Sequence, residues 1–539
     1  MTMYWMKAKP APFRWCTEPH KSARFLIVLV LAFLLAACER PDPAVTVVGP
    51  NQAQPTVAGA AVIPARQGEE SARPTPIIPE MIVPTRPSYA GTPTPDAPHE
   101  TAVSSGPVAS HFVGAGETLG YIAQIYGATV EELLALNQLD PDAVLLVGQE
   151  VLVPSQIDAT TPNFKIIPDS ELVYGPAAQN FDVRAFAESY GGYLLAVTDE
   201  VEGVELDGPE IVQLVADRFS VNPRLLLALL EHRAGWLTKT AVSGASTSPY
   251  LLGYEDETVP GLYLQLSRAA NLLNWGYYGR SEGGITTTTL DDGARLAFAA
   301  DINNGTAGVQ NVLGSFSGVT YESWQRDVGP DGLFATYNRL FGNPFAFTVD
   351  PLWPADLRQP LLQLPWDAGE TWYFTGGPHG GWASGSAWAA IDFAPPAEEL
   401  GCVVSDAWVT AMADGLVVRS DKGAVVVDLD EDGFAGTGWA ILYMHLETRD
   451  RIPVGTFVQT GDRLGHPSCE GGFSNGTHVH VARLYNGRWV SADGAIPLEL
   501  AGWVTQGLGR EYDGLLSRGG VDKEACACRE EGNAITSEP

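Results

Sequence analysis

The triplet His478-Val479-His480 constrains this chain more than any other short segment. Thr477, Val479 and Val481 are β-branched and flank the two histidines, a composition that is typical of a strand. Successive side chains of a strand point to opposite faces, so both imidazoles project to the same face. A helix does not bring residues two positions apart together. We therefore expect a sheet that presents two imidazoles side by side, one able to bind a metal ion and the other to act on water.

Three upstream residues complete a candidate zinc site. His379, Asp392 and His445 each stand in a short strand-like stretch. Catalytic zinc keeps three protein ligands from His, Asp or Glu and leaves a fourth position for water. His379, Asp392 and His480 would supply these ligands. A single histidine is more often an ordinary hydrogen-bonded polar group, but five such residues together favour the metal site.

The segments around these residues resemble the lysostaphin-type and β-lytic zinc endopeptidases, which cut the peptide cross-links of bacterial cell walls. The matching segments are residues 377–380, 390–393, 442–446 and 475–480. Twelve residues separate His379 from Asp392, and this long insert is similar to the β-lytic branch. The resemblance implies an antiparallel all-β, barrel-like peptidase domain over residues 355–505. It also implies that His379, Asp392 and His480 bind zinc and that His445 and His478 are the catalytic residues.

Length and charge indicate an exported protein with several domains. The chain has 539 residues, which is too long for one hydrophobic core, so three or four modules are expected. Lys and Arg total 32 against 64 Asp and Glu, a net charge of -32. This acidity argues against nucleic acid as a partner and favours solubility outside the cell.

The N-terminus has the features of an export signal with a lipid attachment point. Lys21 and Arg24 precede an apolar run that ends in Leu35-Ala36-Ala37-Cys38, which resembles the lipobox of bacterial lipoproteins. Residues 1–38 are therefore expected to be a signal peptide, with lipidation at Cys38. The protein would be an extracytoplasmic, membrane-anchored lipoprotein that faces the cell wall. An uncleaved signal anchor is the alternative, although the apolar run is short for a bilayer.

Residues 39–108 are expected to be a disordered linker. They contain 14 of the 39 prolines, mixed with Thr, Ala and Ser. Such a composition cannot supply the backbone hydrogen bonds of regular structure, so the segment should be extended and semi-rigid.

Residues 109–155 predict a small module in the order strand, helix, helix, strand. This pattern resembles the LysM module, which binds glycans containing N-acetylglucosamine, such as peptidoglycan. The resemblance places the ligand-facing residues on two loops: Gly116, Glu117, Thr118, Leu145 and Val147. A module that folds without binding glycan is the alternative.

Residues 166–350 predict a mainly helical domain. Asn222-Pro223 is typical of an N-cap and first helical residue, and helical patterns also cover 262–275 and 294–313. The helix that contains Glu231 resembles the active-site helix of lysozyme-like transglycosylases, although His232 replaces the usual Ser. Glu231 is thus either a helix-end residue or a second catalytic site in a lysozyme-like domain.

The cysteines support export. Cys402 and Cys469 both fall on loops of the peptidase domain, and we expect them to form a disulfide. Cys526 and Cys528 lie in the segment 506–539, which is expected to be a polar tail. A local disulfide, an intermolecular disulfide and inert thiols remain open for these two.

The acidic segment 428–433 should form the loop of a hairpin. Its Asp428, Asp430 and Asp432 have the spacing that begins a calcium loop, but Trp439 stands where the bidentate Glu is required. A solvated acidic turn is therefore favoured over a calcium site.

Together these features predict a zinc metalloendopeptidase that hydrolyses peptide bonds of peptidoglycan and is targeted by a LysM module. Its partners would be wall glycan, stem peptides and the membrane. Two alternatives remain: a non-catalytic lipoprotein that activates other wall hydrolases, and a lysozyme-like enzyme that cleaves glycan with Glu231.

Overall fold

The computed structural model describes residues 108–539, apart from 114–117, 127, 142, 144, 147–148, 242–248, 283 and 539. The expectations for the signal peptide, Cys38 and the linker concern residues outside this part of the chain. Within the described residues, no helix has both the length and the apolarity that a membrane crossing requires.

The first module has the expected order of strand, helix, helix and strand. Its elements are β1 (Val108–Phe112), α2 (Leu119–Tyr126), α3 (Val130–Asn137) and β2 (Glu150–Pro154). β1 and β2 pair antiparallel. Thr129 and Glu132 form a capping box at the start of α3, which satisfies two backbone N–H groups. The core includes Ile122, Leu133 and Val151, all fully buried between the helices and the strand pair.

The middle domain is mainly helical, as expected. Asn222 caps the first turn of a buried helix through its side chain, and Pro223 is the first helical residue. The helices are α4 (Asp169–Leu172), α5 (Val183–Tyr190), α6 (Gly208–Phe219), α7 (Pro223–Ala234), α8 (Gly261–Ser281), α9 (Asn304–Gly314), α10 (Tyr321–Asp327) and α11 (Leu333–Phe341). The 3-10 turns are Pro176–Ala178, Tyr193–Ala196 and Pro344–Phe347. Short strands join them: β3 (Ala159–Thr160), β4 (Thr198–Val201), β5 (Val204–Asp207), β6 (Thr287–Thr289) and β7 (Arg295–Ala297).

The helical pattern over 294–313 is wrong in its first half. β7 pairs antiparallel with β6 and parallel with β3, and the helix α9 begins only at Asn304. Leu296, Ala297 and Phe298 are all buried. The apolar residues of the strand β7 and of the helix α9 follow each other closely in the sequence, so their pattern resembled one long helix.

The C-terminal domain is built on one antiparallel sheet with the strand order β14-β11-β12-β13-β16-β9-β8-β22, to which β17 is added beside β16. The strands of this sheet are β8 (Thr371–His379), β9 (Ala390–Ala394), β11 (Gly415–Asp421), β12 (Ala424–Asp428), β13 (Trp439–Met444), β14 (Phe457–Val458), β16 (Val479–Tyr485), β17 (Arg488–Trp489) and β22 (Ala534–Thr536). Two smaller antiparallel sheets flank it: β10 (Val409–Thr410) with β15 (Arg463–Gly465), and β18 (Glu499–Leu500), β19 (Trp503–Gly507), β20 (Gly514–Arg518) and β21 (Val521–Glu524).

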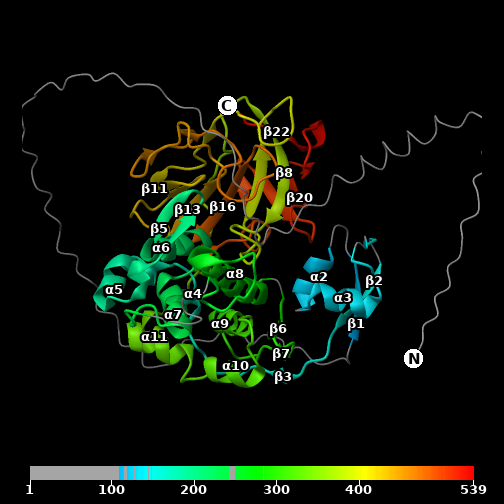
Figure 1. Cartoon of the computed structure of the whole chain (residues 1–539). Coiled ribbons are helices and arrows are strands. Elements are labelled where there is room, and N and C mark those ends of the chain that lie inside the picture. Colours follow the sequence, from blue (N-terminus) through cyan, green and yellow to red (C-terminus); the bar gives the residue numbers. More distant parts are fainter. Residues whose placement is uncertain are drawn as a thin grey trace, which may run out of the picture. The chain divides into compact units, whose positions relative to one another are not determined.

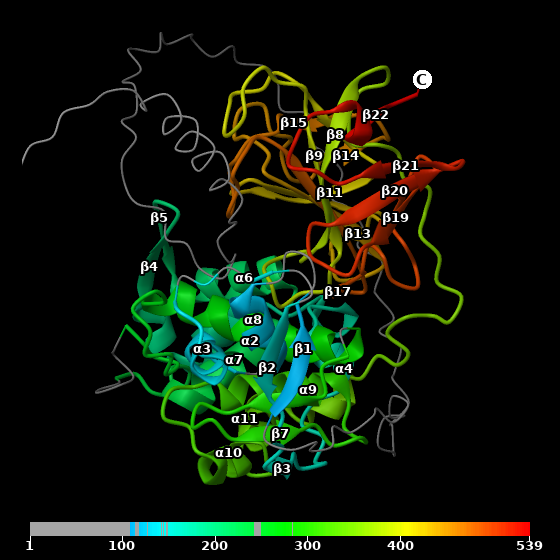
Figure 2. The ribbon, with the colours of Figure 1, turned by 90° about the vertical axis from the view of Figure 1, so that its right-hand side faces the viewer.

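The two faces of the main sheet are both covered. Ile391, Phe393 and Val481 point into the core of the C-terminal domain. Ala390 and Ala482 point the other way and share a core with the helices of the middle domain. Figures 1 and 2 show these helices gathered beside one face of the strands.

Polar contacts also join the sheet to the middle domain. The backbone N–H of Trp489 donates to the Tyr278 hydroxyl at 2.9 Å, and the Ser220 hydroxyl donates to the carbonyl of Gly487 at 2.6 Å. Asp392 and His480 lie on the same face as Ala390 and Ala482, because they are two residues away on the same strands. The candidate site therefore lies on the face of the sheet that the middle domain partly covers.

The segment 506–539 is not the polar tail that the sequence suggested. β22 pairs with β8 and so becomes the edge of the main sheet. Ile535 and Leu516 are almost fully buried and anchor the segment in the core of the C-terminal domain. The strands β20, β21 and β22 have only five, four and three residues, which is too short for a hydrophobic pattern to mark them in the sequence.

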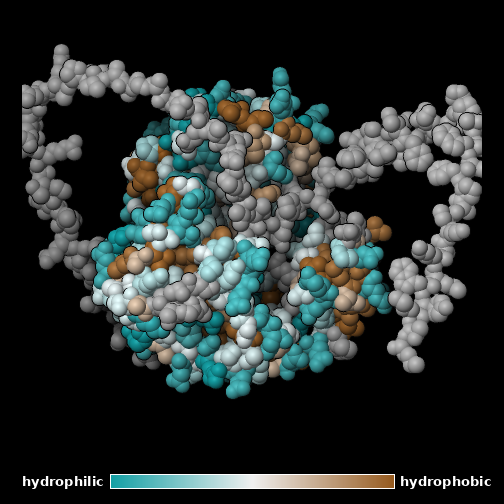
Figure 3. All heavy atoms as spheres, in the orientation of Figure 1, coloured by the Kyte–Doolittle hydropathy of each residue, from teal (hydrophilic) through white to brown (hydrophobic). Residues whose placement is uncertain are grey.

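One face of the molecule is coloured by hydropathy in Figure 3. Hydrophilic residues predominate on the face shown in Figure 3, and hydrophobic residues appear there as separate patches.

Candidate metal centre

Three adjacent strands position the candidate ligands. His379 is the last residue of β8, Asp392 is the central residue of β9, and His480 is the second residue of β16. β9 lies between the other two strands, and Asp392 is directly opposite both His480 and Gly376. A Cβ at Gly376 would lie 2.5 Å from Asp392 Oδ2, so glycine is needed there to make room for the carboxylate.

The three side chains converge on one point. His379 Nε2 and His480 Nδ1 are 2.9 Å apart, and Asp392 Oδ1 lies 3.3 Å from each of these nitrogens. Tetrahedral zinc with bonds of about 2.0–2.1 Å requires ligand atoms roughly 3.3–3.4 Å apart. Asp392 Oδ1 is buried and accepts no hydrogen bond from any described residue. A metal ion would satisfy this oxygen, so the donor set fits zinc.

Backbone carbonyls fix which ring nitrogens are available. His379 Nδ1 lies 2.8 Å from the carbonyl of Gly377, and His480 Nε2 lies 3.1 Å from that of Gly381. Each of these nitrogens must carry a proton and donate it, which leaves His379 Nε2 and His480 Nδ1 with lone pairs toward each other. Two facing lone pairs repel, and a cation between them removes that repulsion.

His445 and His478 lie beside this trio. His445 follows β13 with a φ of +66°, a strained conformation that aims its side chain back toward the site. His478 immediately precedes β16, and the two rings are 4.4 Å apart between centroids. His478 Nε2 is 3.7 Å from Asp392 Oδ1. The sequence-based expectation that all five residues would lie together agrees with this arrangement.

Among the described residues, neither of these histidines forms a hydrogen bond through Nε2. The Nδ1 atoms donate to the carbonyls of Glu470, at 2.9 Å from His445, and Gly476, at 2.7 Å from His478. Burial, reinforced by the neighbouring His478 and His480, holds the pKa of His445 well below its ordinary value. A neutral imidazole with a free Nε2 can orient water and accept a proton.

The pKa of Asp392 also favours metal binding. Burial by itself would raise it, but His379 and His478 lower it well below the ordinary value. The carboxylate therefore stays ionised, as a metal ligand must be.

Tyr512 is a site residue that sequence reasoning missed. Its ring stacks on His379 with centroids 4.2 Å apart, and its backbone bonds both Gly377 and Pro378. The loop between β19 and β20 carries it, within the segment that was expected to be a tail. No local motif marks this tyrosine, so only the pairing of these strands could reveal it.

The expected disulfide is present. Cys402 and Cys469 are bonded at 2.05 Å, which ties the loop after β9 to the loop before β16. The backbone N–H of Thr477 donates to the carbonyl of Gly401 at 3.0 Å beside this bond. Cys526 and Cys528 form the local disulfide, one of the three states left open for them.

Glu231 lies in the last turn of α7, apart from the metal centre in sequence and on another domain. Its carboxylate accepts from Thr238 Oγ1 at 2.6 Å and from the backbone N–H groups of Leu237 and Thr238 at 3.1 and 3.2 Å. Arg339 adds an ion pair at 3.2 Å. These four contacts occupy both carboxylate oxygens and bind α7 to the turn that follows it.

The acidic loop brings three carboxylates together. Ligand atoms of Asp428, Asp430 and Asp432 lie within 4.8 Å of one another. Asp428 accepts from the backbone of Gly433 at 2.9 Å, and Asp432 accepts from Thr437 and Gln179 at 2.8 and 2.7 Å. Donors of the protein therefore already satisfy part of this loop.

Of the expected glycan-binding residues, the structure describes only Thr118 and Leu145. Thr118 is exposed and accepts from the backbone of Tyr121 at 3.1 Å, while Leu145 is partly buried against the module core. Gly116, Glu117 and Val147 lie outside the described residues.

Comparison with known proteins agrees with this organisation. The family described as "LysM domain" matches residues 111–154, and the family "LasA, N-terminal domain" matches residues 165–354. Protease LasA of Pseudomonas aeruginosa strain PAO1 is 28% identical over 349 residues, which cover 61% of this chain and 75% of that protein. Protease LasA of strain UCBPP-PA14 is 27% identical over 348 residues, with the same two shares.

The chain is also similar to solved structures, each over a part of its length. The M23 metalloprotease pseudoalterin from the deep sea is 28% identical with a TM-score of 0.27, covering 31% of this chain and 96% of that one. The catalytic domain of lysostaphin from Staphylococcus simulans is 22% identical with a TM-score of 0.17, covering 23% and 89%. Residues 111–154 thus match the LysM domain, and the similarity of the chain to protease LasA agrees with the converging ligand set of its C-terminal domain.

Proposed function

We propose that this protein hydrolyses peptide bonds of peptidoglycan while its LysM module holds wall glycan. The observation that carries the proposal is the converging trio of His379 Nε2, Asp392 Oδ1 and His480 Nδ1, in which the buried Asp392 oxygen has no donor among the described residues. These three atoms would hold one zinc ion. When bound, zinc supplies a Lewis acid that polarises the scissile carbonyl and lowers the pKa of water.

The protein residues would manage the proton. His478 Nε2 faces the site and accepts a proton from the attacking water, then returns it to the leaving amine. His445 Nε2 accepts a hydrogen bond from the same water and so orients its lone pair toward the carbonyl. The carbonyls of Glu470 and Gly476 keep both rings in the tautomer that this task requires.

Placement in the cell envelope is a further part of the proposal. The sequence Leu35-Ala36-Ala37-Cys38 supports lipidation at Cys38, and the proline-rich residues 39–108 would extend from the membrane into the wall. Cys38→Ser should then release the protein from membrane fractions. Retention of the unacylated variant would instead favour a signal anchor.

The two alternative functions are less well supported. A non-catalytic activator does not need an ionised, donor-free aspartate between two histidines. A glycan-cleaving Glu231 would need a proton to donate, but its two oxygens are engaged by three N–H or O–H donors and Arg339.

Product analysis on purified peptidoglycan distinguishes these three functions. We expect new amino termini, no new reducing sugar ends, and about one zinc per chain. A chelator should abolish the release of amino termini. Sugar ends that appear in the presence of chelator would support the Glu231 alternative, and no product of either kind would support the activator.

A further inference from the structure

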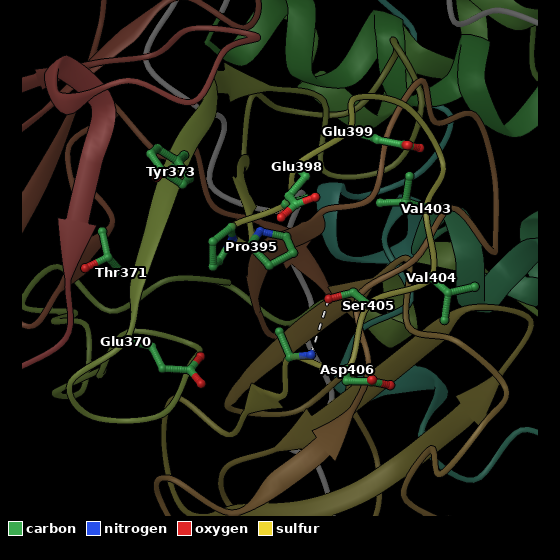
Figure 4. Close-up of a pocket in the computed structure, with 13 residues that line it drawn as sticks. Glu370, Thr371, Tyr373, Pro395, Glu398, Glu399, Val403, Val404, Ser405 and Asp406 are labelled. Atoms are coloured by element: carbon green, nitrogen blue, oxygen red, sulfur yellow. Dashed lines mark hydrogen bonds between the residues drawn. The ribbon is translucent and has the colours of Figure 1, made fainter.

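A pocket of about 730 Å³ lies in the C-terminal domain, where the chain leaves β9 beyond Asp392. Three segments line it: the start of β8, the loop after β9, and residues 403–407. Figure 4 shows Tyr373, Pro395 and Val404 around it, with carboxylates from several directions. This size suits a small ligand or part of a peptide.

One wall of the pocket continues the strand that carries Asp392. Ala394 is two residues beyond Asp392 and opposite Tyr373, which lines the pocket. Ile391 and Phe393 face the opposite core, so Asp392 and Ala394 share a face and are about 7 Å apart along the strand. A peptide cut at the metal centre would reach the pocket within roughly two or three residues.

The other wall is joined to the catalytic histidines. The backbone N–H of Val403 donates to Thr477 Oγ1 at 2.8 Å, and Thr477 is the residue before His478. The Cys402–Cys469 disulfide holds the same loop. Both walls are therefore fixed relative to the reacting groups, as a specificity site requires.

The pocket carries excess negative charge. Asp406 pairs with Arg449 at 2.8 Å, and Glu370 accepts from the indole N–H of Trp372 at 3.1 Å. Glu398 and Glu399 also line the pocket, and within the described part of the chain neither makes a side-chain hydrogen bond or ion pair. Arg529 donates through Nε to the carbonyl of Pro395 at 2.9 Å, so a cation also lies at the rim of the pocket.

The carboxylates are not arranged to bind a metal ion. Among the described residues, sets of three ligand side chains within 4.8 Å occur at the metal centre and in the loop 428–433, and the pocket is not among them. A primary ammonium does not require three carboxylates that converge on one point. Its three N–H donors can reach separate acceptors around one compact charge.

We propose that this pocket is a substrate subsite that binds a primary ammonium group of the wall peptide, with Glu398 and Glu399 as its specificity-determining residues. The inference rests on the proposed function, since it places the ligand on the peptide that the metal centre cuts. The ammonium comes either from the free α-amine of a cross-link peptide or from the side chain of a diamino acid.

The test uses the full chain and a synthetic cross-link peptide that carries both amines. Two further peptides have either the α-amine or the side-chain amine acetylated. We expect acetylation of one of them to lower kcat/KM roughly tenfold, the effect of losing two exposed ion pairs. The amine whose acetylation has this effect is the one bound. Higher salt should reduce the preference, because the pairs are exposed to solvent.

The double variant Glu398→Gln/Glu399→Gln should lose the preference of the wild type. It should cut the peptide with both amines free no faster than the peptide whose bound amine is acetylated. Glu255→Gln/Glu257→Gln is the matched control, since it removes two exposed carboxylates from the middle domain and should keep the preference. Equal kcat/KM for all three peptides in the wild type would overturn the proposal. A preference that survives in the double variant would also overturn it.

Failure of the proposed function would look different. In that case the wild type cuts none of the peptides, and the subsite is tested by binding on the full-length His478→Ala background, which leaves peptides intact. Tighter binding of the free peptide than of one acetylated form, lost in the double variant, would support the ammonium subsite. Equal affinities would refute it.

Discussion

Two buried carboxylates in this molecule have opposite surroundings. Asp392, in the peptidase sheet, has one oxygen with no donor among the described residues and two imidazole nitrogens 3.3 Å away. Glu231, at the end of α7, accepts from three protein donors and pairs with Arg339. Both are at most 8% exposed, so burial alone does not distinguish them.

The difference lies in the neighbours. A buried carboxylate with all its acceptors filled stabilises the chain around it, since its desolvation is already offset. A buried oxygen without a donor, close to imidazole nitrogens, is stabilised when a cation binds between them. The surroundings of Asp392 therefore indicate a ligand, and those of Glu231 indicate a structural role.

The largest effect should come from removing a ligand. We expect His379→Ala or Asp392→Ala to lose the bound zinc and to reduce peptide hydrolysis by at least about 10³-fold, because two protein ligands hold catalytic zinc weakly. Zinc content by atomic absorption and release of amino termini are the measurements. His232→Ala, on the middle domain, is the control and should keep both. Full zinc in both ligand variants would refute the assignment.

His478→Ala separates binding from chemistry. The variant should keep about one zinc per chain, since its Nε2 lies outside the trio, yet lose about 10²–10⁴-fold in kcat because proton transfer is lost. Zinc content and kcat are measured on the same preparation. Loss of zinc together with activity would show that His478 is a metal ligand rather than a proton acceptor.

Asp428 is a third buried carboxylate, intermediate between the other two. Burial, followed by its hydrogen bond with Asp430, raises its pKa to about 7. The folded state holds this proton more tightly than the unfolded state does. The contribution of Asp428 to the unfolding free energy is therefore fully present below about pH 4. It falls by roughly 2–4 kcal/mol as the pH rises to about 7. Denaturant unfolding at pH 4 and pH 8 measures the loss, and Asp428→Asn should not show it.

The same experiment tests the calcium alternative. Asp432→Asn, at an exposed position of the loop, should leave the pH dependence largely in place. If calcium at pH 8 restores the lost stability in the wild type but not in Asp428→Asn, the loop is a calcium site rather than a solvated turn.

The smallest effect is expected for Glu231→Gln. An amide in place of the carboxylate loses the ion pair with Arg339 and turns an N–H₂ group toward other donors, at a cost of about 1–3 kcal/mol in unfolding free energy. Zinc content and peptide hydrolysis should not change. Glu188→Gln, an exposed site on α5, is the control for stability. Loss of glycan cleavage without loss of stability would assign Glu231 a catalytic role.

The sequence was most informative where local pattern and chemistry coincide. The alternation around His478 and His480 predicted a strand with both rings on one side, and the Thr129 and Asn222 signals marked two helix starts. Each of these depends on residues within a few positions, which is the range over which propensity and capping act.

Tertiary structure decided what depends on distant partners. The role of segment 506–539 came from the pairing of β22 with β8, and backbone hydrogen bonds of Tyr512 with Gly377 and Pro378 bring its ring onto His379. The donors around Glu231 and the missing donor at Asp392 appear only when separate segments meet. A sequence shows which groups are present, but only the fold determines which of them are satisfied, because hydrogen bonds and desolvation depend on contact in space.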